Sequence, residues 1–431
     1  MRTMKDSGVE WLGEIPEDWQ VKRLDAIFLN QNSRNKVLGV DSYLSLMANV
    51  GVIPYAEKGA VGNRAPIEFD KCKLVSQGDF VLNTMNFGIG SFGVSAYDGM
   101  VSPVYFVLRP LRAKETLRYY RHLFNTTGFR LFSQMLGSGI LEHRAAIPWD
   151  EFKTIGLPVP CDEEQAAIAS YLDQETSRID TLISKKEQLI EKLLERRQAL
   201  ITQVVTKGLD PNVPMKDSGV EWLGEVPEGW SVQPLWTILT FSTGWTPPSK
   251  DDANFGGEHP WVNISDMGKK EIRETQKTLS DQGVRLVGRH PVATGSLLFS
   301  FKLSVGQVSF AGCELFTNEA IASFSESPSQ QVLLDFAFYM LPVAVPENCS
   351  WNIYGARMLN ESRIRQARII VPPTTEQAKI AAYLDKEISQ IDSLVEKTRK
   401  AIDLLKERRQ ALITQVVTGK IDVRGFAGGN S

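Results

Sequence analysis

Two stretches of the chain carry apolar residues at the heptad spacing of a coiled-coil helix. They run from Glu164 to Thr206 and from Glu376 to Thr418, an offset of 212 residues (376 − 164). Each predicts a helix roughly 60 Å long at about 1.5 Å rise per residue. The expected seam positions are Ile168, Leu172, Ile179, Leu182, Leu189, Leu193 and Leu200, and then Ile380, Leu384, Ile391, Leu394, Ala401, Leu405 and Leu412.

Polar residues interrupt both expected seams, at Lys186 and Arg196 and at Thr398 and Arg408. A helix pair with partners on its flanks tolerates such interruptions better than a strict dimer does. Both helices have a recognisable start, because Asp162 and Thr374 each follow a proline and precede a glutamine (Gln165, Gln377) by three residues. This spacing is typical of a capping box.

A shorter repeat precedes each half of the chain. Met4–Trp19 reads MKDSGVEWLGEIPEDW, and Met215–Trp230 reads MKDSGVEWLGEVPEGW. Proline and glycine exclude a long regular element, and tryptophans usually bury most of their area. We interpret the repeat as an apolar clip that docks on a larger surface, with partner contacts at Trp11, Trp19, Trp222 and Trp230.

The segment after each clip has the pattern of a mixed α/β domain. Short apolar runs between turn residues predict strands at 74–75, 80–82, 104–108 and 155–159, and at 297–299 and 369–371. Helical spacing predicts helices at 114–135, with a break at Gly128, and at 330–341.

These elements predict an α/β fold, or α+β, with two similar mixed α/β target-recognition domains separated by two long antiparallel coiled-coil helices. Antiparallel packing within one chain would bury both seams, give a pseudo-twofold internal repeat and place a domain at each end of the helix pair. The expected parts are an N-terminal clip (1–19), the first domain (20–160), the first spacer helix (161–210), a linker with the repeated clip (211–230), the second domain (231–372), the second spacer helix (373–418) and a C-terminal tail (419–431).

Composition is that of a globular protein, with 42% apolar and 23% charged residues. No apolar run approaches a membrane span and no secretory leader precedes the first repeat, so we expect a cytoplasmic protein. The four cysteines lie far apart, so we expect free thiols and no metal site. A net charge of −3 gives no general sign of nucleic-acid binding, although the first domain has a small surplus of Lys and Arg.

The two helices are more alike than the two domains. Glu195–Thr206 is identical to Glu407–Thr418 on every helix face, whereas the domains have diverged. This contrast predicts that the helices bind the same partner twice and that the domains have different targets. The candidate partner contacts are Arg196, Arg197, Arg408 and Arg409; the alternative is a solvated face with charge pairs four residues apart.

The clips, the proline-to-Glu-Gln helix entries (160–165 and 372–377) and the RRQALITQVVT endings, in this order twice, resemble the specificity subunits of type I restriction–modification systems. The resemblance covers the whole chain and implies that each domain reads one half of an asymmetric bipartite site in double-stranded DNA. It also implies two modification subunits, which methylate adenine, and restriction subunits, which translocate and cut DNA. S-adenosylmethionine, ATP and Mg²⁺ would belong to those partners, and this chain would hold no cofactor.

The sequence contains no GxxxxGK[ST] phosphate loop and no Asn/Asp-Pro-Pro-aromatic motif. We therefore expect a non-catalytic subunit. The main alternative is a two-headed coiled-coil adaptor that joins proteins and does not bind DNA, which the lack of a strong basic charge favours.

DNA recognition needs cations and amides for phosphates and hydrogen-bonding side chains for base edges. The candidates in the first domain are Arg34, Lys36, Lys58, Arg64, Asn83, Asn86, Ser91 and Arg144. Those in the second are Trp245, Lys250, Asn263, Ser300, Lys302, Ser304, Asn352, Tyr354 and Arg357. An ordinary glycine hairpin is the alternative for residues 83–91, buried anchoring for Trp245, and a structural hydrogen-bonding role for Asn263.

Overall fold

The computed structural model describes residues 2–36, 42–48, 50–59, 64–66, 68–85, 87–111, 115–137, 146–288, 290–302, 304–325, 331–351 and 357–425. The chain forms two compact units, residues 1–187 with 399–431, and residues 188–398. Both boundaries between the units fall inside a long helix, because the units are defined by which residues pack together. The domain limits expected from the sequence differ, because they were placed at motifs.

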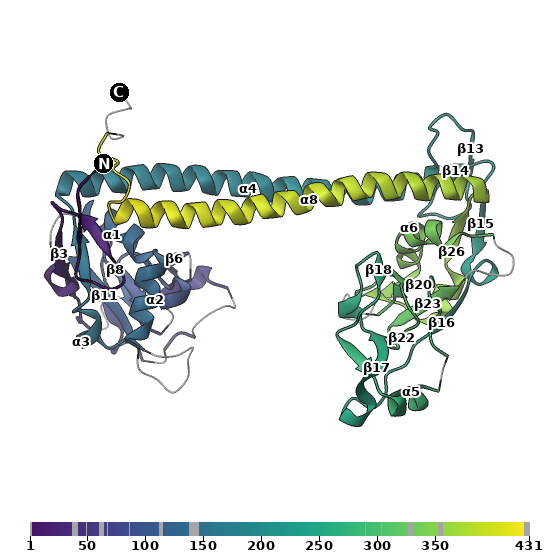
Figure 1. The fold of residues 1–431 in the computed structure, drawn as a ribbon, viewed down its shortest axis with the longest axis horizontal. Coiled ribbons are helices and arrows are strands. Elements are labelled where there is room, and N and C mark those ends of the chain that lie inside the picture. The colour runs from purple at the N-terminus through teal and green to yellow at the C-terminus, as the bar shows by residue number, and fades with distance from the viewer. Residues whose placement is uncertain are drawn as a thin grey trace. The chain divides into compact units, whose positions relative to one another are not determined.

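An antiparallel sheet of order β4-β11-β8-β9 is the centre of the first unit (Figure 1). Its inner strands are β8 (Phe80–Asn83), which is buried throughout, and β11 (Tyr105–Pro110). Its edges are β4 (Phe28–Asn30) and β9 (Phe92–Val94). The two inner strands confirm the strands predicted from apolar runs.

Smaller strand pairs complete the first unit. β3 (Gln20–Arg23) pairs with β12 (Gly156–Val159), which joins the two ends of the domain. β5 (Leu44–Met47) pairs with β6 (Gly51–Pro54), and β7 (Lys73–Val75) pairs with β10 (Gly99–Val101). Apolar residues of these four strands form a separate cluster with residues of β8 and β11.

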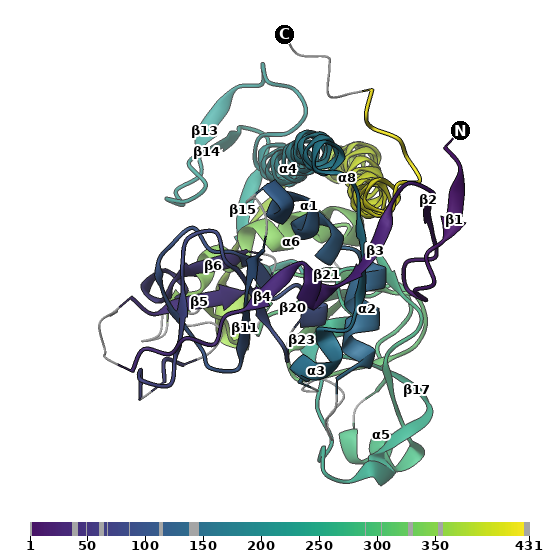
Figure 2. The ribbon, with the colours of Figure 1, turned by 90° about the vertical axis from the view of Figure 1, so that its left-hand side faces the viewer.

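Three helices cover the sheet of the first unit: α1 (Glu115–Phe124), α2 (Thr127–Met135) and α3 (Trp149–Phe152). Figure 2 shows α1 directly beneath the long helices, and the Tyr119 hydroxyl donates to the Val417 carbonyl at 2.8 Å. The predicted break at Gly128 is wrong. The helices separate two residues earlier, because Thr126 caps α2 by accepting from the Phe129 N–H.

The second unit has a sheet of order β16-β23-β20-β21-β18. Its strands are β16 (Thr240–Thr243), β23 (Ile321–Ser325), β20 (Leu297–Ser300), β21 (Val308–Ala311) and β18 (Glu271–Ile272). A second sheet holds β19 (Lys277–Leu279), β17 (Phe255–Val262) and β22 (Phe316–Thr317), with helix α5 (Asp281–Val287) beside it. The predicted strands at 297–299 and 369–371 are confirmed.

The remaining elements of the second unit are β15 (Ser231–Pro234) paired with β26 (Arg368–Val371), β24 (Ser350–Trp351) paired with β25 (Arg357–Met358), and the helices α6 (Leu334–Ala344) and α7 (Glu361–Gln366). Helix α6 packs on β20, β21 and β26. It begins four residues later than predicted, because extended Leu333 donates its N–H to the Gln377 side chain at 2.8 Å.

The two units share one topology. In chain order and pairing, β4, β8, β9 and β11 correspond to β16, β20, β21 and β23, and the closing pair β3–β12 corresponds to β15–β26. The internal repeat therefore extends to the α/β domains, whose sequences alone show little similarity.

Two long helices, α4 (Asp162–Lys207) and α8 (Thr374–Val417), contribute to both units. In the first unit the start of α4 packs with the end of α8, through Ile168 and Leu172 with Ile413 and Val416. In the second unit the end of α4 packs with the start of α8. Each pairing is antiparallel, as predicted.

The seam of the helix pair differs from the predicted one. Leu182, Leu189 and Leu394 are 41–45% exposed. The positions that face inward are Thr176, Ile179, Ile183, Lys186, Ile190, Leu193 and Arg197, and in the second helix Ile388, Ile391, Val395, Thr398, Ile402, Leu405 and Arg409. The arginines that interrupt the apolar seam are therefore Arg197 and Arg409, each one residue after the position expected from the sequence.

The capping boxes predicted at the helix starts are also wrong. Asp162 and Thr374 are the first helical residues. The Gln165 and Gln377 side chains do not bond the backbone of a capping residue. They donate to the carbonyls of Pro160 and Pro372, at 2.9 and 2.8 Å. The glutamines therefore fix each helix to the strand that precedes it.

Both clips dock on their own unit. In the first unit, β1 (Met4–Asp6) pairs with β2 (Glu14–Pro16), and Trp19 is 1% exposed and donates its indole N–H to Glu164 at 2.9 Å. In the second, β13 (Met215–Asp217) pairs with β14 (Glu225–Pro227), and Trp230 donates to Glu376 at the same distance.

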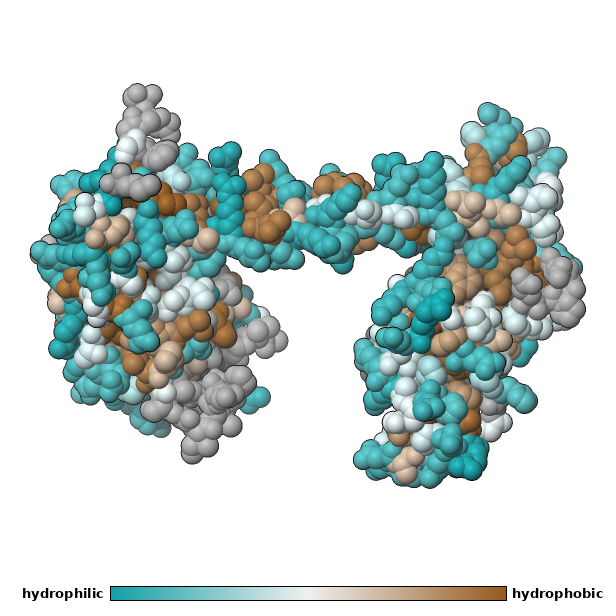
Figure 3. All heavy atoms as spheres, viewed as in Figure 1, coloured by the Kyte–Doolittle hydropathy of each residue, from teal (hydrophilic) through white to brown (hydrophobic). Residues whose placement is uncertain are grey.

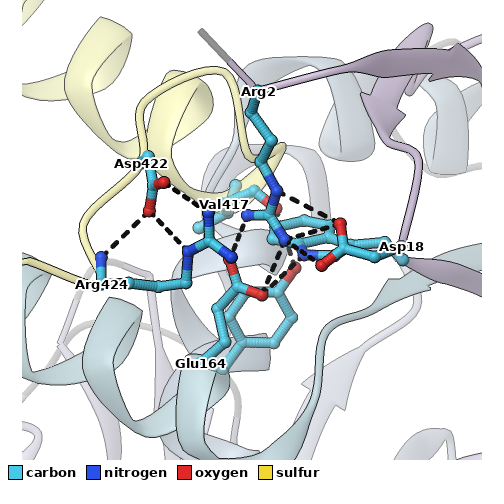
Figure 4. Close-up of polar contacts among 8 residues, drawn as sticks. Arg2, Asp18, Glu164, Val417, Asp422 and Arg424 are labelled. Carbon is cyan, nitrogen blue, oxygen red and sulfur yellow. Dashed lines mark hydrogen bonds and ion pairs between the residues drawn. The ribbon is translucent and has the colours of Figure 1, made fainter.

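The first clip has an additional ionic contact between Arg2, Asp18 and Glu164 (Figure 4). Together with Trp19, which also bonds Glu164, we call it the Arg2 cluster. The Arg2 guanidinium bonds both Asp18, at 2.6 Å, and Glu164, at 3.0 Å. The tail after α8 lies against the same clip, because Ile421 and Val423 pack into the core of the first unit. Next to them, Arg424 pairs with Asp422 at 2.6 Å.

Candidate nucleic-acid interface

Strand directions bring distant loops together at one end of the main sheet of the second unit. β16 and β20 lie on either side of β23 and both run antiparallel to it. They therefore end at the same end of the sheet, at Thr243 and Ser300, where β23 begins at Ile321. We call this end of the sheet the loop edge of the second unit. It consists of the described residues of the segments 244–250, 301–307 and 318–320.

Backbone hydrogen bonds fix these loops to each other. The Trp245 N–H donates to the Thr317 carbonyl, and the Phe301 N–H donates to the Ala320 carbonyl, both at 2.9 Å. Gly244 is required here, because a Cβ at this residue would lie 1.9 Å from the Thr317 carbonyl oxygen. The loop edge is therefore a braced surface.

Four predicted contact residues of the second domain are exposed on this edge: Trp245, Lys250, Lys302 and Ser304. The Trp245 ring is 36% exposed, so it is not a fully buried anchor. The Lys302 ammonium lies 5.6 Å from the centre of the Phe301 ring, which is buried beneath it. The edge thus combines an aromatic face with two cations, which is the chemistry that single bases and phosphates accept.

Two other candidates of the second domain have structural roles. Ser300 is fully buried; its hydroxyl donates to the Ser304 carbonyl and accepts from the Gln307 N–H at 3.1 Å. The Asn263 amide oxygen accepts from Asn318 at 3.4 Å, and Asn263 also caps a short helical turn. Both side chains therefore brace loops of their own unit.

The first unit has an equivalent loop edge, where β4 and β8 end and β11 begins. It consists of the described residues of the segments 31–36, 84–91 and 102–104. Arg34 and Lys36 are exposed there. Arg34 forms a backbone bridge to Lys73, and the buried Lys73 ammonium donates to the Tyr105 carbonyl at 2.7 Å. Burial, and next the nearby Arg34 charge, lowers the pKa of Lys73. The exposed Arg34 and Lys36 give this edge its positive charge.

Two candidate residues of the glycine-rich stretch 83–91 in the first unit are buried. Asn83 and Ser91 are each 4% exposed, and the Asn83 side chain accepts from the Met85 N–H at 3.1 Å. Their burial favours the hairpin alternative for these two residues. Lys58 is buried beside the Tyr55 ring, at 4.7 Å, whereas Arg64 is exposed.

Some candidates lie outside the described residues: Asn86, Arg144, Asn352 and Tyr354. Of Arg357, the structure describes the backbone in β25 and not the side chain. These residues stay predictions.

The partner-contact candidates divide into two groups. Trp19 and Trp230 are buried by their own units, so they cannot present a ring to a partner; Trp11 and Trp222 are half-buried. Arg197 pairs with Asp392 at 3.0 Å and Arg409 with Asp180 at 2.9 Å, within the helix pair. Arg196 and Arg408 remain exposed.

Sequence reasoning missed two features of the surface. One is Glu319, which lies on the loop edge of the second unit and accepts a hydrogen bond from the Thr246 hydroxyl. The other is a set of exposed leucines on the long helices, namely Leu182, Leu189, Leu194, Leu394 and Leu404; Figure 3 shows apolar patches along these helices. The register error explains why three of these leucines were assigned to the seam.

The described part of the chain contains no group of His, Cys, Asp or Glu side chains that could hold a metal ion. None of its helices has the length and apolarity needed to cross a membrane. None of the four cysteines, all of which lie in described parts of the chain, is in a disulfide bond.

The paired α/β units and the antiparallel helices define the fold of a two-domain specificity subunit. A sequence model of the type I restriction modification DNA specificity domain matches residues 16–192 and again 227–404. The chain belongs to this family of type I restriction–modification specificity subunits, which confirms the resemblance.

Among curated relatives, the putative type I restriction enzyme MjaX specificity subunit of Methanocaldococcus jannaschii is 25% identical, over 96% of each chain. The MjaIX specificity subunit of the same organism is 24% identical over a match that spans 38% of either chain.

Two solved structures share the fold. One, described as the structural basis of complex assembly and conformational transition of the type I R-M system, has a TM-score of 0.73 at 18% identity and covers 94% of this chain and 99% of its own. The HsdS subunit of Thermoanaerobacter tengcongensis has a TM-score of 0.54 at 17% identity and covers 94% and 98%.

Proposed function

We propose that this chain is the non-catalytic DNA-recognition subunit of a type I restriction–modification complex, and that each unit reads one half of an asymmetric bipartite site through its loop edge. The observation that carries the proposal is the equivalence of the two edges. The same strands end there in both units, yet the side chains differ. One scaffold with two sets of contact residues is what recognition of two unlike half-sites requires.

The two edges also differ in charge. Residues 31–36, 84–91 and 102–104 contain Arg34 and Lys36 and no Asp or Glu. The edge of the second unit carries Trp245, two cations (Lys250 and Lys302) and one carboxylate, Glu319. Cations fix a protein on the phosphate backbone, whereas aromatic and hydrogen-bonding side chains contribute to base recognition.

The long helices supply the partner surface in this proposal. Leu182 and Leu394 occupy equivalent positions of the repeat, and both are exposed. Arg196 and Arg408 form a second equivalent exposed pair. Exposed apolar residues with an arginine at each of two equivalent places fit two copies of one partner. We assign them to the two modification subunits, which would bring S-adenosylmethionine, while restriction subunits would bring ATP and Mg²⁺.

The test is DNA binding by the complex of this chain with its modification subunit, measured at several salt concentrations. Replacing Lys302 or Lys36 with Ala should weaken binding to all duplexes and reduce the salt slope by about 1 per lost phosphate contact. The control is Lys5→Ala, because Lys5 is an exposed cation on the first clip. Equal slopes for all variants, with the complex still assembled, would favour the adaptor alternative.

A further inference from the structure

Glu319 is the one carboxylate in the three segments that form the loop edge of the second unit. A carboxylate near DNA phosphates is repelled, so an exposed one on a DNA-binding edge needs a specific reason. We propose that Glu319 is a base-reading residue of the second unit, which accepts a hydrogen bond from an exocyclic amino group in the major groove. This inference rests on the proposed function.

The backbone around Glu319 is held from three sides. The Asn318 N–H donates to the Val262 carbonyl at 3.1 Å, and the Asn318 side chain accepts from the Ala320 N–H at 3.0 Å. The Ala320 carbonyl in turn accepts from Phe301. A side chain on such a support loses little freedom when it binds, which is what discrimination between bases needs.

The Glu319 carboxylate is itself oriented. The Thr246 hydroxyl donates to one of its oxygens, Oε2. Burial acts to raise the pKa of Glu319, but the Thr246 hydrogen bond, a backbone hydrogen bond and the Lys302 charge together hold it below its usual value. The group is therefore ionised at neutral pH, and it can only accept hydrogen bonds.

An ionised carboxylate selects among base edges. In the major groove, cytosine N4 and adenine N6 are donors, whereas guanine and thymine present acceptors at the corresponding place. Glu319 would therefore favour cytosine or adenine at one position and disfavour the other two bases. Lys302, close by, offsets the repulsion between the carboxylate and the phosphates. The edge of the first unit has no carboxylate in its segments, so it would lack this form of recognition.

The experiment is selection of bound sequences from duplexes randomised in both half-sites, using the chain assembled with its modification subunit. The variants are Glu319→Gln, Thr246→Val, Lys302→Gln and a matched control, Glu314→Gln. Glu314 is exposed on the same unit, in the loop after β21, at the opposite end of the sheet from the loop edge. Thermal melting of each variant checks that the unit remains folded.

We expect the wild-type and Glu314→Gln complexes to select an amino-bearing base at one position of one half-site. Glu319→Gln should reduce that preference roughly tenfold, the scale of a single base contact, and leave the other half-site unchanged. The selected base distinguishes cytosine from adenine. Thr246→Val should lower the same preference by a smaller factor, because it removes the hydroxyl that orients the carboxylate.

Unchanged preferences for folded Glu319→Gln would overturn the inference. If Lys302→Gln then still weakens binding and lowers the salt slope, the loop edge binds DNA and the proposed function stands without a base contact from Glu319. If neither variant changes binding or selection, the loop edge is not the DNA interface, and both proposals fail.

Discussion

The Arg2 cluster provides the sharpest stability prediction, because the second unit serves as its control. At the clip offset of 211 residues (215 − 4), Val213 stands where Arg2 does and Gly229 where Asp18 does. In the second unit a continuous chain joins the end of α4 to the clip. In the first unit the end of α8 and the clip lie far apart in the sequence. There Arg2 ties the clip to the start of α4, by bonding both Asp18 and Glu164.

The size of the effect follows from burial. Glu164 is 5% exposed and the Arg2 side chain 10% exposed. Arg2→Met leaves a buried carboxylate with the Trp19 indole N–H as its hydrogen-bond donor. Loss of one partner from a buried ion pair costs about 3 kcal/mol. The matched control, Glu376→Gln, weakens one hydrogen bond to the half-exposed Glu376, which costs about 1 kcal/mol.

Hydrogen exchange followed by mass spectrometry resolves the two units. Arg2→Met should speed exchange of the clip (4–19) and the last turns of α8 (410–417) by roughly 100-fold, because each 1.36 kcal/mol is a factor of about ten. Residues 199–207, the last turns of α4, should be unaffected. Glu376→Gln should show the reverse pattern, with an acceleration of about fivefold.

Two results would refute this reasoning. If Arg2→Met accelerated exchange equally at 410–417 and 199–207, the cluster would not be specific to the first unit. If it accelerated neither, the ion pair would contribute nothing to closing that unit.

Three further predictions concern packing, pH and connectivity. Ile179→Ala should destabilise the first unit by about 3 kcal/mol in urea unfolding and Leu182→Ala by less than about 0.5, because only Ile179 is in the seam; equal effects would contradict the register. Burial, which outweighs the hydrogen bond to Asp173, lowers the pKa of His122, so the folded first unit favours neutral His122. Stability should be complete above about pH 6.5 and fall as the pH drops below it; His122→Gln should flatten thermal melting between pH 8 and 5, and an unchanged slope would exclude His122 as the cause. A chain opened between Asn212 and Val213, with residues 1 and 431 joined by a Gly-Ser linker, should melt within a few degrees of the wild type, and failure to fold would show that the first clip and the tail cannot be connected in this way.

The sequence was sufficient to predict the strands and long helices with strong apolar patterns. β8 and β20 are buried on both faces, so each appears as an unbroken apolar run. The helix repeat likewise indicated antiparallel pairs. Both follow from apolar pattern alone, which depends little on neighbouring segments.

The seam register could not be predicted in this way, because polar residues occupy it. Thr176 and Thr398 are buried because each hydroxyl donates to the carbonyl four residues earlier, at 2.6 and 2.7 Å. A leucine can be exposed in the isolated chain if a partner protein covers it in a complex. Hydrophobicity therefore did not identify the inward face of these helices.

The candidate interface was only partly predictable for a similar reason. Lys302 and Trp245 proved to be exposed, whereas Ser300 and Asn83 brace their own loops. A polar residue after a strand suits either role, and only the fold distinguishes them. Glu319 was missed because it follows a strand of two residues, β22, and joins the loop edge through the pairing of β23.

The most direct test of the account is a hybrid in which residues 20–160 come from a related subunit with a different target, followed by mapping of methylated adenines in cells that express it with its modification subunit. We predict that one half of the methylated site changes and the other half is retained. A change in both halves, or in neither, would contradict the assignment of one half-site to each unit.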